Sequence, residues 1–147
     1  LGDKAHRYAL QKVYISLSYK RDMRPGDLLV IYRKGTMAGR KAYESVVSTI
    51  CVVDEVRYNF SSKEDYLKCC ENRTVFSQET LNQLWEKHSE KLLVVKFIFI
   101  KSLTKRITLG ELWSGGIIPQ YSGPRPFDHI PDTNFDTILA KSQTNTL

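Results

Sequence analysis

The residues of most chemical interest are aromatic, hydroxyl and basic side chains of the kind that capture a nucleic-acid base. Capture of an unpaired base needs a ring for its face, polar groups for its edge and cations for the flanking phosphates. Each stacked base contributes about 1–3 kcal/mol to binding. The candidates are Tyr14, Tyr32, Trp113 and Tyr121 for the face, Ser16 and Ser18 for the edge, and Arg33, Lys34, Arg40 and Arg125 for phosphate.

A basic cluster surrounds one of these rings. Seven of the 22 Lys and Arg residues lie between Lys20 and Lys41. Arg24 precedes the apolar run from Leu28 to Tyr32, whereas Arg33 follows it. A five-residue strand spans about 17 Å, so we expect two basic patches, of which only the one from Arg33 onwards belongs with Tyr32.

The alternative for the tryptophans is an ordinary place in a hydrophobic core. Trp113 stands beside Leu109 and Leu112, and Trp85 follows Leu81 and Leu84 at helical spacing. On this view Trp85 is a core residue, and Trp113 is either core or part of a binding site.

Metal and nucleophile chemistry have little support in the sequence. The three histidines lie far apart, and Cys69 and Cys70 have no ligand pair at zinc spacing. Three cysteines imply no disulfide framework. Neighbouring residues on a helix point about 100° apart, so we expect one of Cys69 and Cys70 to be buried and the other exposed. No cofactor or metal is expected.

Composition fits one small domain of a larger protein. The chain has 147 residues, a net charge of +6 and a pI near 9.2, which favour a polyanionic partner. It contains no signal-peptide pattern and no apolar run long enough to cross a membrane, so we expect a cytoplasmic location and no membrane partner. Because the chain begins at Leu1, we expect residues 1–11 to lead in from a covalently linked N-terminal domain.

The hydrophobic periodicity predicts strands first, helices in the middle and strands again. Residues 12–18 alternate apolar and polar types, with Val13, Ile15 and Leu17 on one face and Tyr14, Ser16 and Ser18 on the other. Further elements are predicted as strands at 28–32, 46–56 and 91–103, helices at 62–71 and 78–90 begun by serine caps, a helical turn at 109–113, and a helix at 132–140 capped by Asp132 or Thr133. This order is typical of an α+β domain with a curved or closed, mostly antiparallel sheet.

The same motifs in this order resemble the PUA-like superfamily, and within it the EVE domains. The resemblance covers residues 12–140 and rests on "MRPGDLLVIY", "VVSTICVVDEV", a helical insertion, "VKFIFIKSL", "ITLGELWSGGI" and "FDHIPDTNFDTIL". It implies a pseudo-barrel with short helices in a central insertion and at the C-terminus, followed by a tail at 141–147. It also implies an RNA-binding or modified-base-binding module, with the ligand in a cleft of the barrel. Two features depart from the family pattern: Arg33 and Lys34 after the strand, and the length of the insertion.

Two other functions compete with nucleic-acid recognition. The related ASCH domains include amidohydrolases that act on modified nucleosides and carry a Gly-x-Lys-x-x-Glu-x-Arg motif. Gly39, Lys41 and Glu44 match it, but Val46 stands in place of the arginine. The second competitor is an interaction domain that binds no ligand and docks on its parent's other domain. We expect a binding module rather than an enzyme, with a cleft edged by Tyr32, Ser16 and Trp113.

Overall fold

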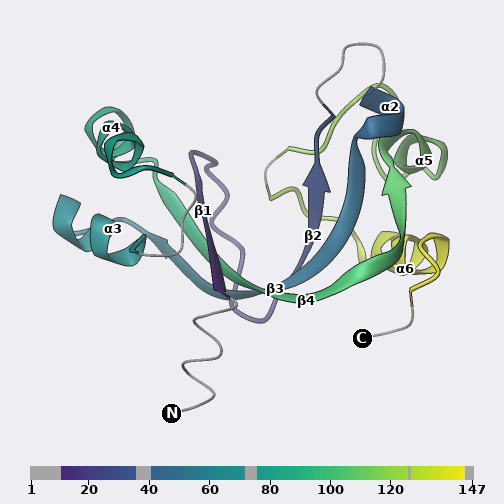
Figure 1. Ribbon diagram of the computed structural model, residues 1–147, viewed down its shortest axis with the longest axis horizontal. Helices are drawn as coiled ribbons and strands as arrows, with labels where there is room; N and C mark the ends of the chain where they lie inside the picture. Colours follow the sequence, from purple (N-terminus) through teal and green to yellow (C-terminus); the bar gives the residue numbers. More distant parts are fainter. Residues whose placement is uncertain (1–10, 36–40, 72–75, 126, 145–147) are drawn as a thin grey trace. The chain divides into compact units, whose positions relative to one another are not determined.

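The computed structural model describes residues 11–35, 41–71, 76–125 and 127–144 (Figure 1). None of the helices in these ranges is long and apolar enough to cross a membrane. The elements are β1 (Gln11–Ser16), β2 (Leu28–Arg33), α2 (Lys41–Glu44), β3 (Val46–Tyr58), α3 (Lys63–Cys69), α4 (Gln78–His88), β4 (Leu93–Thr108), α5 (Leu109–Ser114) and α6 (Asp132–Lys141).

The four strands form one sheet in the order β1-β4-β3-β2. β1 runs antiparallel to β4, with Tyr14 opposite Val95. The end of β4 returns to the start of β3, where the Leu109 N–H donates to the Ser45 carbonyl at 2.8 Å. The α+β class and the antiparallel sheet are therefore confirmed; β1 and β2 are its edge strands, and a closed barrel is not part of this strand order.

The contacts within the chain define two compact units, where composition alone suggested one domain. The first unit comprises residues 1–28 and 52–99, and the second unit comprises residues 29–51 and 100–147. Each unit is discontinuous in sequence, and both β3 and β4 pass from one unit into the other. The residues that each strand contributes to a core therefore change along its length.

The core of the first unit is built around Tyr66. This side chain is fully buried, its ring stacks on Trp85 at 5.5 Å between centroids, and its hydroxyl donates to the Leu81 carbonyl at 3.1 Å. Ser62 and Ser77 cap α3 and α4 through their hydroxyl oxygens, as predicted. Trp85 is partly buried and packs against this buried cluster, which agrees with its predicted contact with the core.

Two predictions in this unit are wrong. Leu17 is 42% exposed, because β1 ends at Ser16 and its alternation ends there too. Cys69 and Cys70 are both buried. α3 ends at Cys69, and Cys70 is the C-cap residue, with its side chain also in the core, so the expected split between a buried and an exposed thiol is lost.

The core of the second unit gathers residues from β3, β4, α5 and α6. Ile50, Ile107 and Ile138 are almost completely buried in it. α5 is begun by a capping box in which Thr108 and Glu111 bind each other's backbone N–H groups. This confirms the predicted helical turn and fixes the direction in which α5 leaves the sheet.

The last helix begins at Asp132, as predicted, but its N-cap residue differs from the prediction. Pro131 rather than Asp132 or Thr133 is its N-cap residue, and no side chain caps it; instead the Pro131 carbonyl accepts the N–H groups of Asn134 and Phe135 at 2.9 and 3.1 Å. The fixed φ of proline suits an extended residue before a helix.

The chain after α6 packs on the second unit. Ser142 and Thr144 are buried, and their oxygens accept the N–H groups of Lys105 and Thr104 on β4. Residues 141–144, which the sequence assigned to a tail, therefore belong to the second unit.

Truncating Ile107 tests the assignment of the second half of β4 to a core. We expect Ile107→Ala to lower the free energy of unfolding by about 2–5 kcal/mol, because it leaves a cavity. The neighbouring Arg106 is exposed, so Arg106→Ala is the matched control and should change stability by less than about 0.5 kcal/mol. Urea denaturation measures both, and equal effects of the two substitutions would contradict this core.

Candidate nucleic-acid interface

Trp113 links the core of the second unit to its surface. It lies on α5, is partly buried and packs against the core cluster. Its indole Nε1–H donates to the Ser122 carbonyl at 2.7 Å. Its ring meets that of Tyr121 edge to face, with centroids 5.5 Å apart and planes at 64°. The core interpretation of Trp113 therefore holds for the buried part of its side chain, and the binding interpretation of the exposed part stays a prediction.

Tyr121 is an exposed ring on a constrained backbone. It is 83% exposed and has a φ of 64°, in the left-handed region that a bulky residue rarely adopts. Such a conformation costs about 1–3 kcal/mol, and such strain concentrates at functional sites. A turn closed by the Ser122 N–H on the Pro119 carbonyl holds the residue beside Trp113. The structure thus brings together two of the predicted aromatic residues, Trp113 and Tyr121.

Arg125 stands on the same connection, three residues beyond Ser122. It is exposed, and its backbone N–H donates to the Asp128 carboxylate at 2.9 Å, while the Asp128 N–H donates back to the Arg125 carbonyl. These bonds form a turn that fixes the backbone from which the guanidinium extends. They place a cation and a carboxylate in the same turn.

Tyr32, Arg33 and Lys34 lie at the end of the edge strand β2. Tyr32 is partly buried and packs against the same core as Trp113, whereas Arg33 and Lys34 are exposed. The chain turns directly after them, where the Gly35 N–H donates to the Ser45 hydroxyl at 2.8 Å. A Cβ at Gly35 would lie 2.7 Å from the Cβ of Glu44, so this close approach requires glycine.

Tyr14, Ser16 and Ser18 belong to the first unit. Tyr14 is exposed on β1, but Ser16 is buried and its hydroxyl oxygen accepts the Ser18 N–H at 3.0 Å. The Ser18 hydroxyl oxygen in turn accepts the Lys20 N–H at 3.2 Å. Both serines therefore organise the chain after β1. The expected cleft edged by Tyr32, Ser16 and Trp113 combines residues of two units, and Ser16 is buried, so only Tyr32 and Trp113 belong to the same unit.

The residues of the hydrolase alternative are only partly described. Gly39 and the Lys41 side chain lie outside the described residues, as does the phosphate candidate Arg40, and Glu44 is partly buried at the end of α2. Val46, at the position of the motif's arginine, is buried in β3. In the described part of this motif, a buried valine therefore stands where the motif has an arginine.

Cysteine chemistry is suppressed by burial. Burial raises the pKa of the Cys51 thiol to about 11 and that of Cys70 to about 12, and it raises the pKa of Cys69 in the same direction. These side chains are neutral thiols at physiological pH and poor nucleophiles. Across the ranges that the structure describes, no group of three or more His, Cys, Asp or Glu side chains could hold a metal ion.

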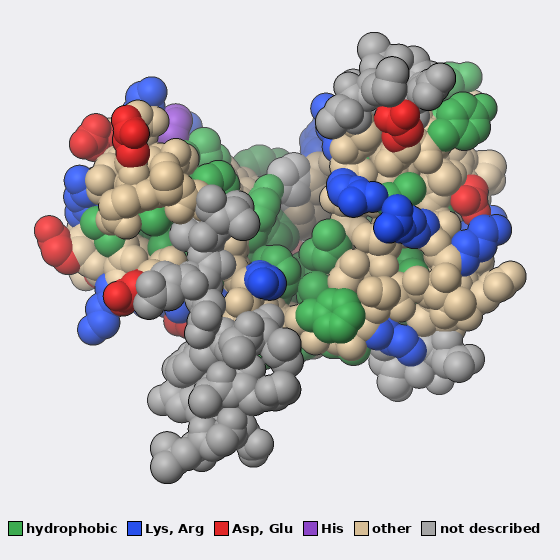
Figure 2. All heavy atoms as spheres, in the orientation of Figure 1, with side chains coloured by type: hydrophobic (Ala, Val, Ile, Leu, Met, Phe, Trp, Pro, Cys, Tyr) green, Lys and Arg blue, Asp and Glu red, His purple; other side chains and the backbone are tan. Residues whose placement is uncertain are grey.

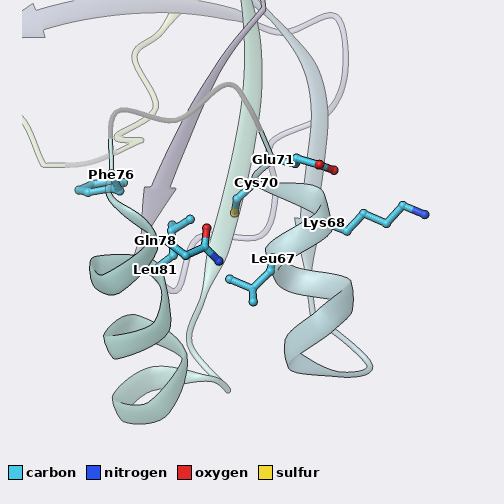
Figure 3. A pocket seen from close by; sticks show the side chains of 7 residues that line it. All are labelled: Leu67, Lys68, Cys70, Glu71, Phe76, Gln78 and Leu81. Atoms are coloured by element: carbon cyan, nitrogen blue, oxygen red, sulfur yellow. The ribbon is translucent and has the colours of Figure 1, made fainter.

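A depression lies between α3 and α4 of the first unit (Figure 3). Leu67 and Leu81 point towards one another across it, and Gln78 reaches in from α4. Cys70 also lines it, as a neutral thiol, whereas Lys68 points away from the opposing helix. Glu71, like Lys68, points away from the opposing helix, so the thiol of Cys70 has neither of these charged groups directed towards it in the depression.

Sequence reasoning found the rings of this interface but missed what positions them. The Ser122 carbonyl and the left-handed backbone of Tyr121 have no signature in residue type. The only sequence signal is the turn chemistry of Gly115, Gly116 and Pro119 between the two rings.

Comparisons of the chain with protein-family models, with curated proteins and with solved structures find no match.

The buried thiols give a direct test of the core. At pH 8 the raised pKa of Cys51 leaves roughly a hundredfold less thiolate than in an unfolded chain, so we expect a disulfide reagent such as DTNB to react slowly with the native protein. In guanidinium all three cysteines should react. Because the unfolded thiols ionise first as pH rises above 9, stability should fall from pH 9 towards pH 12. Rapid labelling of the native thiols would contradict their burial.

Proposed function

We propose that the chain is a nucleic-acid recognition module whose second unit binds an unpaired base on the Trp113–Tyr121 pair. The observation that carries this proposal is an exposed tyrosine in a left-handed conformation, held edge to face against a tryptophan that is anchored to the core. An exposed aromatic residue in a strained backbone conformation lowers the stability of the fold. A role in binding explains why such a residue is present.

The anchoring of Trp113 favours binding because it lowers the entropy lost on association. Its indole is fixed by the core on one side and by the bond to the Ser122 carbonyl. Tyr121 is fixed by the turn and by contact with Trp113. A base that stacks on a ring already in place needs to order few protein side chains.

The geometry favours single strands over duplexes. In a duplex each base face is covered by its neighbours, so only an unpaired or flipped base can stack on a protein ring. Most of the surface of the Tyr121 side chain is open to such a base. We therefore expect single-stranded RNA or DNA to bind more tightly than a duplex of the same sequence.

Charge favours the second unit as the binding surface. By sequence it holds nine Lys and Arg residues against five Asp and Glu, whereas the first unit holds 13 against 11. Figure 2 shows acidic and basic side chains mixed over α3 and α4 of the first unit, which is typical of a solvated face. In the second unit the exposed Arg33, Lys34 and Arg125 supply cations for phosphate.

The proposed fold family is the PUA-like superfamily, with the EVE domains as the branch that the sequence resembles. The four-stranded antiparallel sheet with short helices in the middle and at the C-terminus is compatible with this proposal. The closed pseudo-barrel that the resemblance implied is not part of this proposal, because the described sheet is open, with β1 and β2 as its edge strands. A covalently linked N-terminal domain and a cytoplasmic location belong to the proposal.

Removing the Tyr121 ring tests the proposed function. We expect Tyr121→Ala to weaken binding of a fluorescein-labelled single strand of about 20 nucleotides by roughly 5- to 150-fold at low salt, the equivalent of one lost stacked base. Fluorescence anisotropy gives the dissociation constants. Tyr121→Phe should bind normally, because it keeps the ring.

Tyr43 provides the matched control, since it is another exposed tyrosine of the second unit, at 77% exposure. Tyr43→Ala should bind as the unchanged protein does. If the unchanged protein binds no better than millimolar at low salt, or if the two alanine substitutions have equal effects, the proposed function is wrong.

A further inference from the structure

The connection between β1 and β2, residues 17–27, is an ordered loop with a prominent exposed ring. Tyr19 is 82% exposed, nearly as much as Tyr121. The Lys20 Nζ lies 6.0 Å from the centroid of the Tyr19 ring. An exposed aromatic ring with an adjacent cation is the combination that binds a base and its phosphate.

The first half of the loop is organised by its own side chains. The Arg21 guanidinium donates to the carbonyls of Ser18 and Lys20 at 2.6 and 2.8 Å and lies 5.0 Å from the centre of the Tyr58 ring. The Ser18 hydroxyl oxygen accepts the Lys20 N–H. These contacts surround Tyr19 in sequence and fix the backbone that carries it.

The second half is tied to β3. The Gly26 N–H donates to the Val53 carbonyl, and the Val53 N–H donates to the Asp27 carbonyl, both at 2.8 Å. Gly26 has a φ of 95°, which a residue without a Cβ adopts freely. The Arg24 guanidinium donates to the carbonyls of Arg21 and Met23, so it joins the two halves of the loop.

The charge of the loop suits an anionic ligand. It contains Lys20, Arg21 and Arg24 against Asp22 and Asp27. The Asp27 carboxylate already accepts the Arg24 N–H at 2.8 Å. The loop therefore offers an exposed ring on an ordered backbone, with cations nearby, in a segment without regular secondary structure. Such segments commonly carry binding residues.

We infer that this loop is a second contact for single-stranded nucleic acid, in which Tyr19 stacks on a base and Lys20 neutralises its phosphate. This inference rests on the proposed function, but it concerns the first unit, whereas Trp113 and Tyr121 belong to the second.

The test compares single and double substitutions on a labelled oligothymidylate of about 20 nucleotides, which forms no duplex of its own. We expect Tyr19→Ala to weaken binding by roughly 5- to 150-fold and Tyr19→Phe to leave it unchanged. Because the only ring contact of Tyr19 described here is with Lys20, Tyr19→Ala should fold normally, and circular dichroism checks this. Tyr43→Ala is again the control.

The outcomes separate this inference from the proposed function. If Tyr121→Ala weakens binding and Tyr19→Ala does not, the loop contact is overturned and the proposed function stands. If only Tyr19→Ala weakens binding, the loop contact stands and the Trp113–Tyr121 pair is overturned. If both do so and the double substitution weakens binding further, both stand. Absence of binding by the unchanged protein overturns both.

Discussion

Two strands, β3 and β4, run through both units of this protein, and β4 contributes residues to both hydrophobic cores. β4 lends Val94 to the cluster around Tyr66 and Ile107 to the cluster under α5, and β3 begins in the second unit and ends in the first. Neither unit is a continuous stretch of sequence, so neither core can form until distant segments have paired. Helices and loops follow the ends of these strands in the chain, so the residue at which each strand ends determines where the next element begins.

The candidate interface depends on this arrangement through Trp113. β4 ends at Thr108, whose capping box with Glu111 starts α5 and so determines which residues of that short helix meet the core. Leu109 and Leu112 are buried, whereas Trp113, the next residue after Leu112, is only partly buried. The indole N–H of Trp113 then binds the Ser122 carbonyl, and its ring contacts Tyr121. A surface feature is thus specified by the point at which a core strand stops.

Local features were predictable from the sequence, and features that depend on distant partners were not. The caps at Ser62 and Ser77 and the turn at 109–113 were predicted correctly because their signals lie within four residues. The burial of Ser16 and of both adjacent cysteines was missed, since it depends on where β1 and α3 end.

In the candidate site, too, some features were predictable from the sequence and others were not. Residue type was enough to select Trp113, Tyr121 and Arg125. Their pairing depends on the sign of one backbone angle at Tyr121 and on one carbonyl, and neither is encoded in composition or spacing. The ordered loop around Tyr19 was seen only as basic charge, because arginines that bind backbone carbonyls cannot be told from solvated ones by sequence.

The most direct test of the central claim is an NMR titration of the two tryptophan indole N–H signals with oligothymidylate. The chain has two tryptophans, and Trp85→Phe identifies the signal of Trp113. Trp85 stacks on Tyr66 in the first core and serves as an internal reference. The account predicts that the Trp113 signal shifts in a saturable way while that of Trp85 does not move. An unchanged Trp113 signal under conditions where the strand is bound, or a shift confined to Trp85, would contradict it.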